Sequence, residues 1–143
     1  MLFRSRIKRW RLHDDREQTL MKASHINHPS AIWCRENMSN YLWLFEMWTH
    51  LLDEYTYRYG KHHACGRLIG DLAMPPVKIS TASKFFAPTP AMPTELKVLA
   101  DKPVPGRKYD SLKSYHNYYN LAKRGFATWA GKVNSRPTPE WFN

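Results

Sequence analysis

The sequence SAIWCRENMSNYLWLFEMWTHLLDEYTYRYG, residues 30–60, predicts one long helix around which the rest of the chain is expected to fold. Ser30 suits the N-cap of this helix, and Gly60 suits its end. Large apolar side chains recur between them at steps of three and four residues, which predicts one buried stripe. The stripe comprises Tyr41, Leu44, Phe45, Trp48, Leu51, Leu52 and Tyr55.

Shorter elements are predicted on both sides of this helix. Residues 1–12 form a basic arm whose apolar spacing suits either a short strand or an irregular segment. Asp14 or Asp15 can cap a short helix that ends at about Ser24. Residues 62–72 predict another short helix, which two glycines weaken.

The second half of the chain predicts a loop and then a final helix. Residues 73–108 hold seven of the ten prolines, and they are expected to form a long loop that wraps over the helices. Asp110 or Ser111 then starts a helix to about Lys132, and the aromatic tail at 136–142 is expected to dock. The apolar stripe of the final helix comprises Tyr115, Tyr118, Tyr119, Ala122, Phe126 and Trp129.

These elements predict an all-α protein, with residues 1–143 in a single compact domain built on a long central helix. No apolar run approaches the roughly 20 residues that cross a bilayer, so membrane insertion is not expected. The N-terminus has no apolar signal core, and two cysteines are too few for a disulfide scaffold. We therefore expect a cytoplasmic protein.

The formal charge of +10 is unevenly distributed. Residues 1–25 carry seven Lys or Arg against three acids, residues 26–101 carry seven of each, and residues 102–136 carry eight against one. Two basic ends that converge on one face would bind a polyanion through counterion release. Nucleic acid, double-stranded DNA first, is the expected partner. The alternatives are a basic protein whose charge has no dedicated partner, and one that meets an acidic protein surface or RNA in a larger assembly.

The predicted nucleic-acid contacts are basic residues in these two ends. In the final helix, tyrosines alternate with cations, an arrangement that suits either core packing or stacking of exposed bases. The predicted contacts are Arg4, Arg6, Arg9, Arg11, Arg16, Lys113, Lys123, Arg124 and Lys132.

A second face of the long helix places polar groups beside Trp43 and Met47. The simpler interpretation is a solvent-exposed helix face that carries an i, i+4 ion pair between Glu54 and Arg58. Its functional interpretation is a pocket wall in which arginines meet phosphate and glutamates act as acid or base. The candidate pocket residues are His28, Arg35, Glu36, Asn40, Glu54, Arg58 and Lys61.

A metal site is not predicted, and neither is a cofactor. His25 with His28, and His62 and His63 with Cys65, are the clusters that invite a metal interpretation. Their spacing lacks the paired ligands of structural zinc sites. His28, which precedes Pro29, suits a turn residue that binds backbone groups where the helix begins.

Several motifs together resemble those of phage proteins described as pyrimidine-dimer DNA glycosylases, relatives of the endonuclease V type. The resemblance covers about residues 16–63 and rests on NHPSAIW at 27–33, Glu54 and RYGK at 58–61. Further motifs are MPTE at 92–95, the Tyr118-Tyr119 pair and PEWF at 139–142.

The resemblance implies a small helical enzyme that flips a nucleotide from duplex DNA and attacks its sugar with the N-terminal α-amine. A neutral amine fraction is available because the reference pKa of an α-amine is near 8. The bulky Leu2 disfavours removal of Met1, so the amine would be that of Met1. Glu17 is the nearest match for the assisting carboxylate, with Arg16 beside it as a phosphate contact.

The sequence thus predicts a DNA-binding protein that acts as a small DNA glycosylase and abasic-site lyase. One alternative is a non-catalytic nucleic-acid-binding or assembly protein, for which an exposed apolar patch would argue. The second is a nucleotide-processing enzyme with its pocket on the long helix, using Glu36, Glu54 and Arg58.

Overall fold

The computed structural model describes residues 16, 19–21, 24–82 and 84–143. It combines helices with a two-stranded antiparallel sheet, so the all-α prediction is wrong. The predicted basic arm at 1–12 lies outside the described residues, as does most of the helix predicted at 14–24.

The prediction of one long central helix from residue 30 to 59 is also wrong, because this segment forms two helices, α2 (Pro29–Cys34) and α3 (Met38–Tyr59). His28, not Ser30, caps α2: its Nδ1 accepts a hydrogen bond from the Ser30 N–H at 3.2 Å. Asn37 starts the second helix, because its side chain accepts from the Asn40 N–H at 2.9 Å. No proline or glycine marks this junction at residues 35–37, which is why the sequence predicted one helix.

The end of α3 at Gly60 was predicted correctly. Gly60 has a φ of 66°, the left-handed conformation that favours glycine at a helix end, and its N–H donates to the Thr56 carbonyl. Leu52 on the predicted stripe is buried, but Leu51 is 59% exposed and does not belong to the core. The apolar face of α3 is therefore narrower than predicted.

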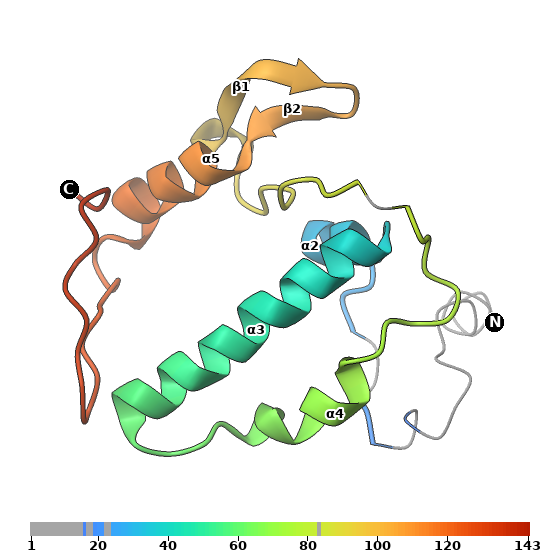
Figure 1. Ribbon diagram of the computed structural model, residues 1–143. Helices are drawn as coiled ribbons and strands as arrows, with labels where there is room; N and C mark the ends of the chain where they lie inside the picture. Colours follow the sequence, from blue (N-terminus) through green and yellow to red (C-terminus); the bar gives the residue numbers. More distant parts are fainter. Residues whose placement is uncertain (1–15, 17–18, 22–23, 83) are drawn as a thin grey trace.

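After α3 the chain turns back along it through η2 (Ala64–Leu68), a 3-10 helix, and α4 (Ile69–Leu72) (Figure 1). The single helix predicted at 62–72 is thus a 3-10 helix that continues as a short α-helix. Tyr41 attaches α4 to α3, since its hydroxyl donates to the Leu72 carbonyl at 2.8 Å.

The segment predicted as a loop at 73–108 contains most of the sheet. A short 3-10 helix, η3 (Thr94–Leu96), precedes β1 (Val98–Val104), which pairs antiparallel with β2 (Arg107–Asp110). Val98 lies opposite Asp110, Leu99 opposite Tyr109 and Val104 opposite Arg107, with an irregular register between the last two pairs.

The hairpin turns at Pro105 and Gly106. Proline fixes φ near −65°, and Gly106 has a φ of 76°, a combination typical of a type II turn. Pro103 lies within β1, where an edge strand tolerates the missing N–H donor.

Helix α5 (Ser111–Tyr118) follows the hairpin directly and continues as a short π-helix, η4 (Tyr119–Lys123). Asp110 caps α5 as predicted, with its side chain accepting from the Lys113 N–H at 2.9 Å. The predicted extension to Lys132 is wrong: the helical conformation ends before Gly125, a residue that disfavours helix by about 1 kcal/mol.

The tail docks as predicted, against α5 and η4. Asn120 holds it at two points, donating to the Trp141 carbonyl at 2.9 Å and accepting from the Asn143 N–H at 3.2 Å. The Trp141 ring stacks on His116, with centroids 4.2 Å apart and planes 3° from parallel.

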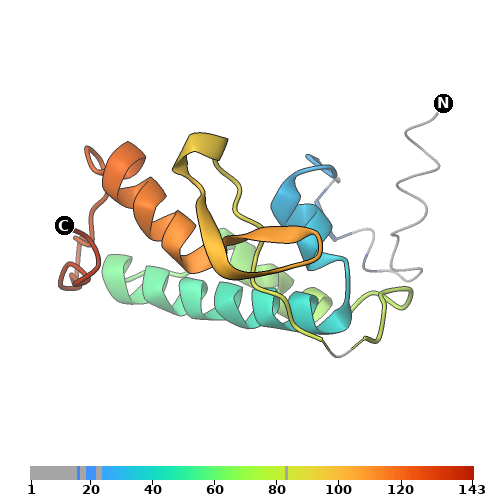
Figure 2. The same ribbon diagram turned by 90° about the horizontal axis from the view of Figure 1, so that it is seen from above.

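The buried apolar side chains of the described residues are few: Trp33, Leu52, Leu68 and Ile79. Figures 1 and 2 show the hairpin and α5 lying together on one side of α3, with residues 124–143 running from α5 to the end of α3. None of the helices in the described part of the chain has the length and apolarity needed to cross a membrane.

Candidate nucleic-acid interface

Six of the predicted site residues lie outside the described residues. They are Met1, Arg4, Arg6, Arg9, Arg11 and Glu17. Their roles in catalysis and DNA contact stay predictions.

The predicted contacts Arg16 and Arg124 both make hydrogen bonds within the protein. Arg16 donates to the Asp71 carbonyl at 2.7 Å and to the Met74 carbonyl at 3.0 Å. Arg124 donates to the Asn143 carbonyl. Both guanidinium groups hold segments of the chain together, and a phosphate would have to share them with these carbonyls.

The candidate pocket residues divide into two groups near opposite ends of α3. Glu36 and Asn40 lie at its beginning, and Glu54 and Arg58 near its end. The 14 helical residues from Asn40 to Glu54 correspond to about 21 Å at the rise of 1.5 Å per residue, and Glu36 lies before the first turn of α3. The structure therefore does not bring the two glutamates into one pocket.

Asn40 is fully buried and connects three segments. Its Nδ2 donates to the Trp33 carbonyl at 2.9 Å and to Glu36 Oε2 at 3.4 Å, and its Oδ1 accepts from the Phe86 N–H at 3.1 Å. The Trp33 indole N–H completes the junction by donating to the Phe86 carbonyl at 2.8 Å. These bonds fix Glu36 and Phe86 relative to α3.

Glu54 is held between two arginines. Arg58 donates to its Oε1 at 2.7 Å, and Arg136 donates to both of its oxygens, to Oε1 at 3.2 Å and to Oε2 at 2.9 Å. Hydrogen bonds from Arg136 and then Arg58 lower the pKa of the Glu54 carboxyl below its usual value. Arg136 also lies 4.0 Å over the Tyr57 ring, so this group attaches residues 129–136 to the end of α3.

The remaining candidate pocket residues take separate positions. Arg35 ends α2, where its N–H donates to the Ala31 carbonyl, and His28 caps the same helix. Lys61 is exposed just beyond the end of α3.

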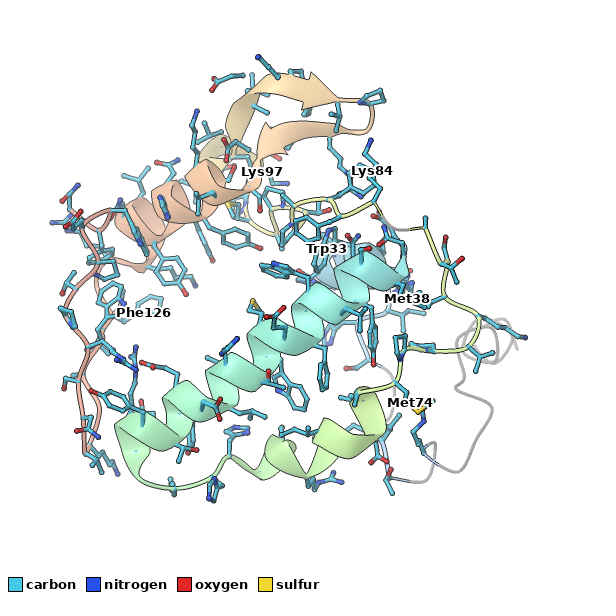
Figure 3. The ribbon with its side chains drawn as sticks, in the orientation of Figure 1. Trp33, Met38, Met74, Lys84, Lys97 and Phe126 are labelled. Carbon is cyan, nitrogen blue, oxygen red and sulfur yellow. The ribbon has the colours of Figure 1, made fainter. Side chains whose placement is uncertain are left out.

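Cations and aromatic rings lie together on the hairpin and the segment beside it, where Figure 3 labels Lys84 and Lys97. We call this group of residues the basic surface. The Phe86 ring has Lys84 at 5.1 Å and Arg107 at 4.4 Å from its centroid. The basic surface comprises Lys84, Phe86, Lys97, Lys102, Arg107, Lys108 and Tyr109.

The second ring of the basic surface repeats this arrangement. The Tyr109 ring has Lys97 at 5.2 Å and Lys108 at 5.1 Å from its centroid. Cation–π contacts hold these ammonium groups in place without neutralising them, so their charge remains available to a ligand.

The predicted contacts on and after α5 differ in their surroundings. Lys113 pairs with Asp101 at 2.9 Å, and hydrogen bonding to Asp101 raises the Lys113 pKa. Lys123 lies 5.0 Å from the centroids of both Tyr118 and Phe126, and Lys132 is exposed.

Within the described residues, no three side chains of His, Cys, Asp and Glu gather in a way that could hold a metal ion. His63 caps η2, accepting from the Cys65 N–H at 3.1 Å. His62 and His63 also line a half-open hollow of about 260 Å³ between α3 and η2. Burial raises the pKa of the Cys34 thiol to about 11, so this thiol is a poor nucleophile near neutral pH.

Most of the basic surface was not predicted, because its residues were expected in an irregular loop. The Pro105-Gly106 dipeptide, a turn signal between two segments rich in valine and basic residues, could have identified the hairpin. The contacts of Arg107 and Arg136 with glutamates over 70 residues away left no local signal.

Comparisons of the chain with protein-family models, with curated proteins and with solved structures found no match.

Proposed function

We propose that this protein binds nucleic acid, double-stranded DNA first, through the basic surface. The observation that carries the proposal is the paired arrangement of cations around the rings of Phe86 and Tyr109. Positioned cations on a two-stranded ribbon suit a nucleic-acid backbone, and a ribbon of this kind fits the major groove of B-form DNA.

The same contacts favour a duplex over unpaired bases. Two cations lie over each ring, so a base that stacked there would have to displace them. Cations directed at phosphates fix a protein on a duplex without reading its sequence. We therefore expect weak dependence on base sequence.

The test measures binding to a 20-base-pair duplex by fluorescence anisotropy between 50 and 200 mM salt. About six phosphate contacts would lower the affinity roughly a thousandfold over this range. Replacing Lys97 and Lys108 by glutamine should reduce the slope of log affinity against log salt by about 0.9 for each phosphate that is no longer neutralised. A flat salt response of the unmodified protein would contradict the proposal.

The matched control replaces Lys61 and Lys78 by glutamine, which changes the net charge equally. Both residues are exposed but belong to other parts of the surface. The slope should stay close to that of the unmodified protein. Equal effects of the two double variants would mean that net charge, not the basic surface, governs binding.

We also propose the glycosylase and lyase activity as a reaction of the bound DNA, with the Met1 amine as nucleophile and Glu17 as its acid or base. The amine adds to the C1′ aldehyde of an abasic sugar and water leaves, which forms an imine that borohydride reduces to a stable protein–DNA adduct. Acetylating the amine should abolish the adduct and leave binding largely intact. Glu17→Gln should prevent strand cleavage without affecting binding, and the absence of any adduct with dimer-containing or abasic DNA would exclude this activity.

A role in an assembly is the second candidate, because the described residues expose many large apolar side chains. On α3 alone, Leu42, Met47 and Leu51 are 43%, 43% and 59% exposed. Exposed apolar side chains gathered on one element are typical of surfaces that partners cover. Light scattering tests this role: self-association that Met47→Glu abolishes would support it, and a monomer at all concentrations would favour DNA binding alone.

A further inference from the structure

The Glu36 carboxylate lies against a cation of the basic surface. Glu36 Oε2 accepts a hydrogen bond from Arg107 Nη2, which joins the link between α2 and α3 to the tip of the hairpin. The Arg107 guanidinium also lies 4.4 Å from the centroid of Phe86. Arg107 thus has its charge neutralised by a carboxylate of the same protein. Its guanidinium also lies beside an aromatic ring.

The buried Asn40 fixes the position of Glu36, because its Nδ2 donates to the same carboxylate oxygen at 3.4 Å. The side chains of Glu36 and Arg107 remain 37% and 21% exposed. A phosphate oxygen could therefore approach this pair from solvent, and it would offer Arg107 the same acceptor chemistry as the carboxylate.

We infer that Glu36 sets the affinity of the basic surface for phosphate, because its carboxylate takes the place on Arg107 that a backbone phosphate would otherwise occupy. This inference rests on the proposed nucleic-acid binding. In the unmodified protein the lysines contact the polyanion, while Arg107 stays with Glu36. A ligand gains Arg107 only by displacing the carboxylate, so Glu36 limits binding to ligands that engage several lysines at once.

The test replaces Glu36 by glutamine, which keeps an oxygen for Asn40 and removes the charge. The Phe86 ring continues to hold Arg107, which becomes a preorganised phosphate donor. The Glu36→Gln variant should bind the 20-base-pair duplex about five- to tenfold more tightly at 100 mM salt. Its salt slope should steepen by about 0.9, the value for one additional neutralised phosphate.

The double variant separates this mechanism from a general change in charge. Adding Arg107→Gln to Glu36→Gln should cancel the gain and return the affinity to within twofold of that of the unmodified protein. Glu95→Gln, an equal change in charge at an exposed position, should have a much smaller effect than Glu36→Gln.

Four outcomes are decisive. Equal gains for Glu36→Gln and Glu95→Gln, or a gain that survives the loss of Arg107, would overturn the inference and leave the proposed function intact. Weaker binding by a folded Glu36→Gln variant would also overturn it, since Glu36 would then support the surface. If neither the unmodified protein nor Glu36→Gln binds DNA, the proposed function fails and the inference fails with it.

Discussion

At the scale of single residues, Asn40 shows how a buried amide can organise the structure around it. Its side chain satisfies the Trp33 carbonyl and the Phe86 N–H, groups from segments that are far apart in sequence. Its position beside tryptophan on a helix predicted a pocket residue. Its complete burial and its bonds give it a structural role that no local pattern reveals.

Asn40→Ala should lower the free energy of unfolding by about 1–3 kcal/mol, because the Phe86 N–H loses its side-chain partner, while the Trp33 carbonyl still accepts from the Glu36 N–H at 3.3 Å. Urea denaturation followed by fluorescence measures the loss. Asn134→Ala is the control, since its amide also donates to a carbonyl, that of Tyr57 at 2.9 Å, but is exposed. A loss at Asn40 no larger than that at Asn134 would contradict the role assigned to burial.

The glutamate between two arginines should make stability depend on pH. The pKa of Glu54 is lower in the folded protein than in the unfolded chain, chiefly because Arg136 and Arg58 donate to it. Its stabilising contribution is complete above the unfolded pKa of about 4.3 and is lost as the pH falls through the folded value.

Thermal denaturation from pH 7 to pH 3 tests this expectation. The melting temperature of Glu54→Gln should fall less below about pH 5 than that of the unmodified protein. Arg136→Gln, which removes the arginine that donates to both carboxylate oxygens, should also flatten the profile. Identical profiles for all three proteins would show that the cluster does not contribute to stability.

At the scale of elements, the sequence predicted boundaries that depend on local chemistry and missed those that depend on distant contacts. Gly60 ends α3 and Asp110 begins α5 because a left-handed glycine and a capping carboxylate act within one turn. The hairpin was missed because prolines argued against strands, although β1 tolerates Pro103 at its edge. The contact of the π-helix with the tail, in which Asn120 donates to the Trp141 carbonyl, likewise joins residues 21 positions apart.

The segment at 129–136 provides a test of one such distant contact. A Cβ atom added at Gly131 would overlap the Asn134 carbonyl oxygen and would lie 2.6 Å from that of Arg58. Gly131→Ala should therefore detach this segment from the end of α3 and destabilise the protein by about 1–3 kcal/mol.

Gly125→Ala is the matched control, because a Cβ atom there would meet nothing within 4 Å. Urea denaturation should show little change for it. Hydrogen exchange should quicken at Val133, whose N–H donates to the Arg58 carbonyl, in Gly131→Ala alone. Unchanged protection of Val133 in Gly131→Ala would contradict the packing described.

At the scale of the whole molecule, two groups of elements each pack among themselves. Helix α3 contacts α2, and η2 contacts α4, while α5 contacts η3, both strands and η4. The groups are joined at Phe86, at the Glu36–Arg107 pair and at the end of α3. The sequence predicted a single core because periodicity identifies buried faces but not which faces meet.

This division predicts that the two groups open separately. Hydrogen exchange measured with increasing denaturant should give different opening free energies for the amides of α3 and α5. Asn40→Ala, which weakens a junction, should increase the difference. A single shared opening free energy in both proteins would show that the joints couple the groups into one cooperative unit.

The hairpin also determines how the protein behaves toward copies of itself. A two-stranded sheet has two open edges, and such edges invite strands from other chains to add and grow into fibrils. Strand β1 reads VLADKPV: the proline interrupts the row of donors, and the charges of Asp101 and Lys102 oppose close stacking of identical strands. Pro103, a residue type that argued against a strand in the sequence, therefore also disfavours the pairing of this strand with other chains.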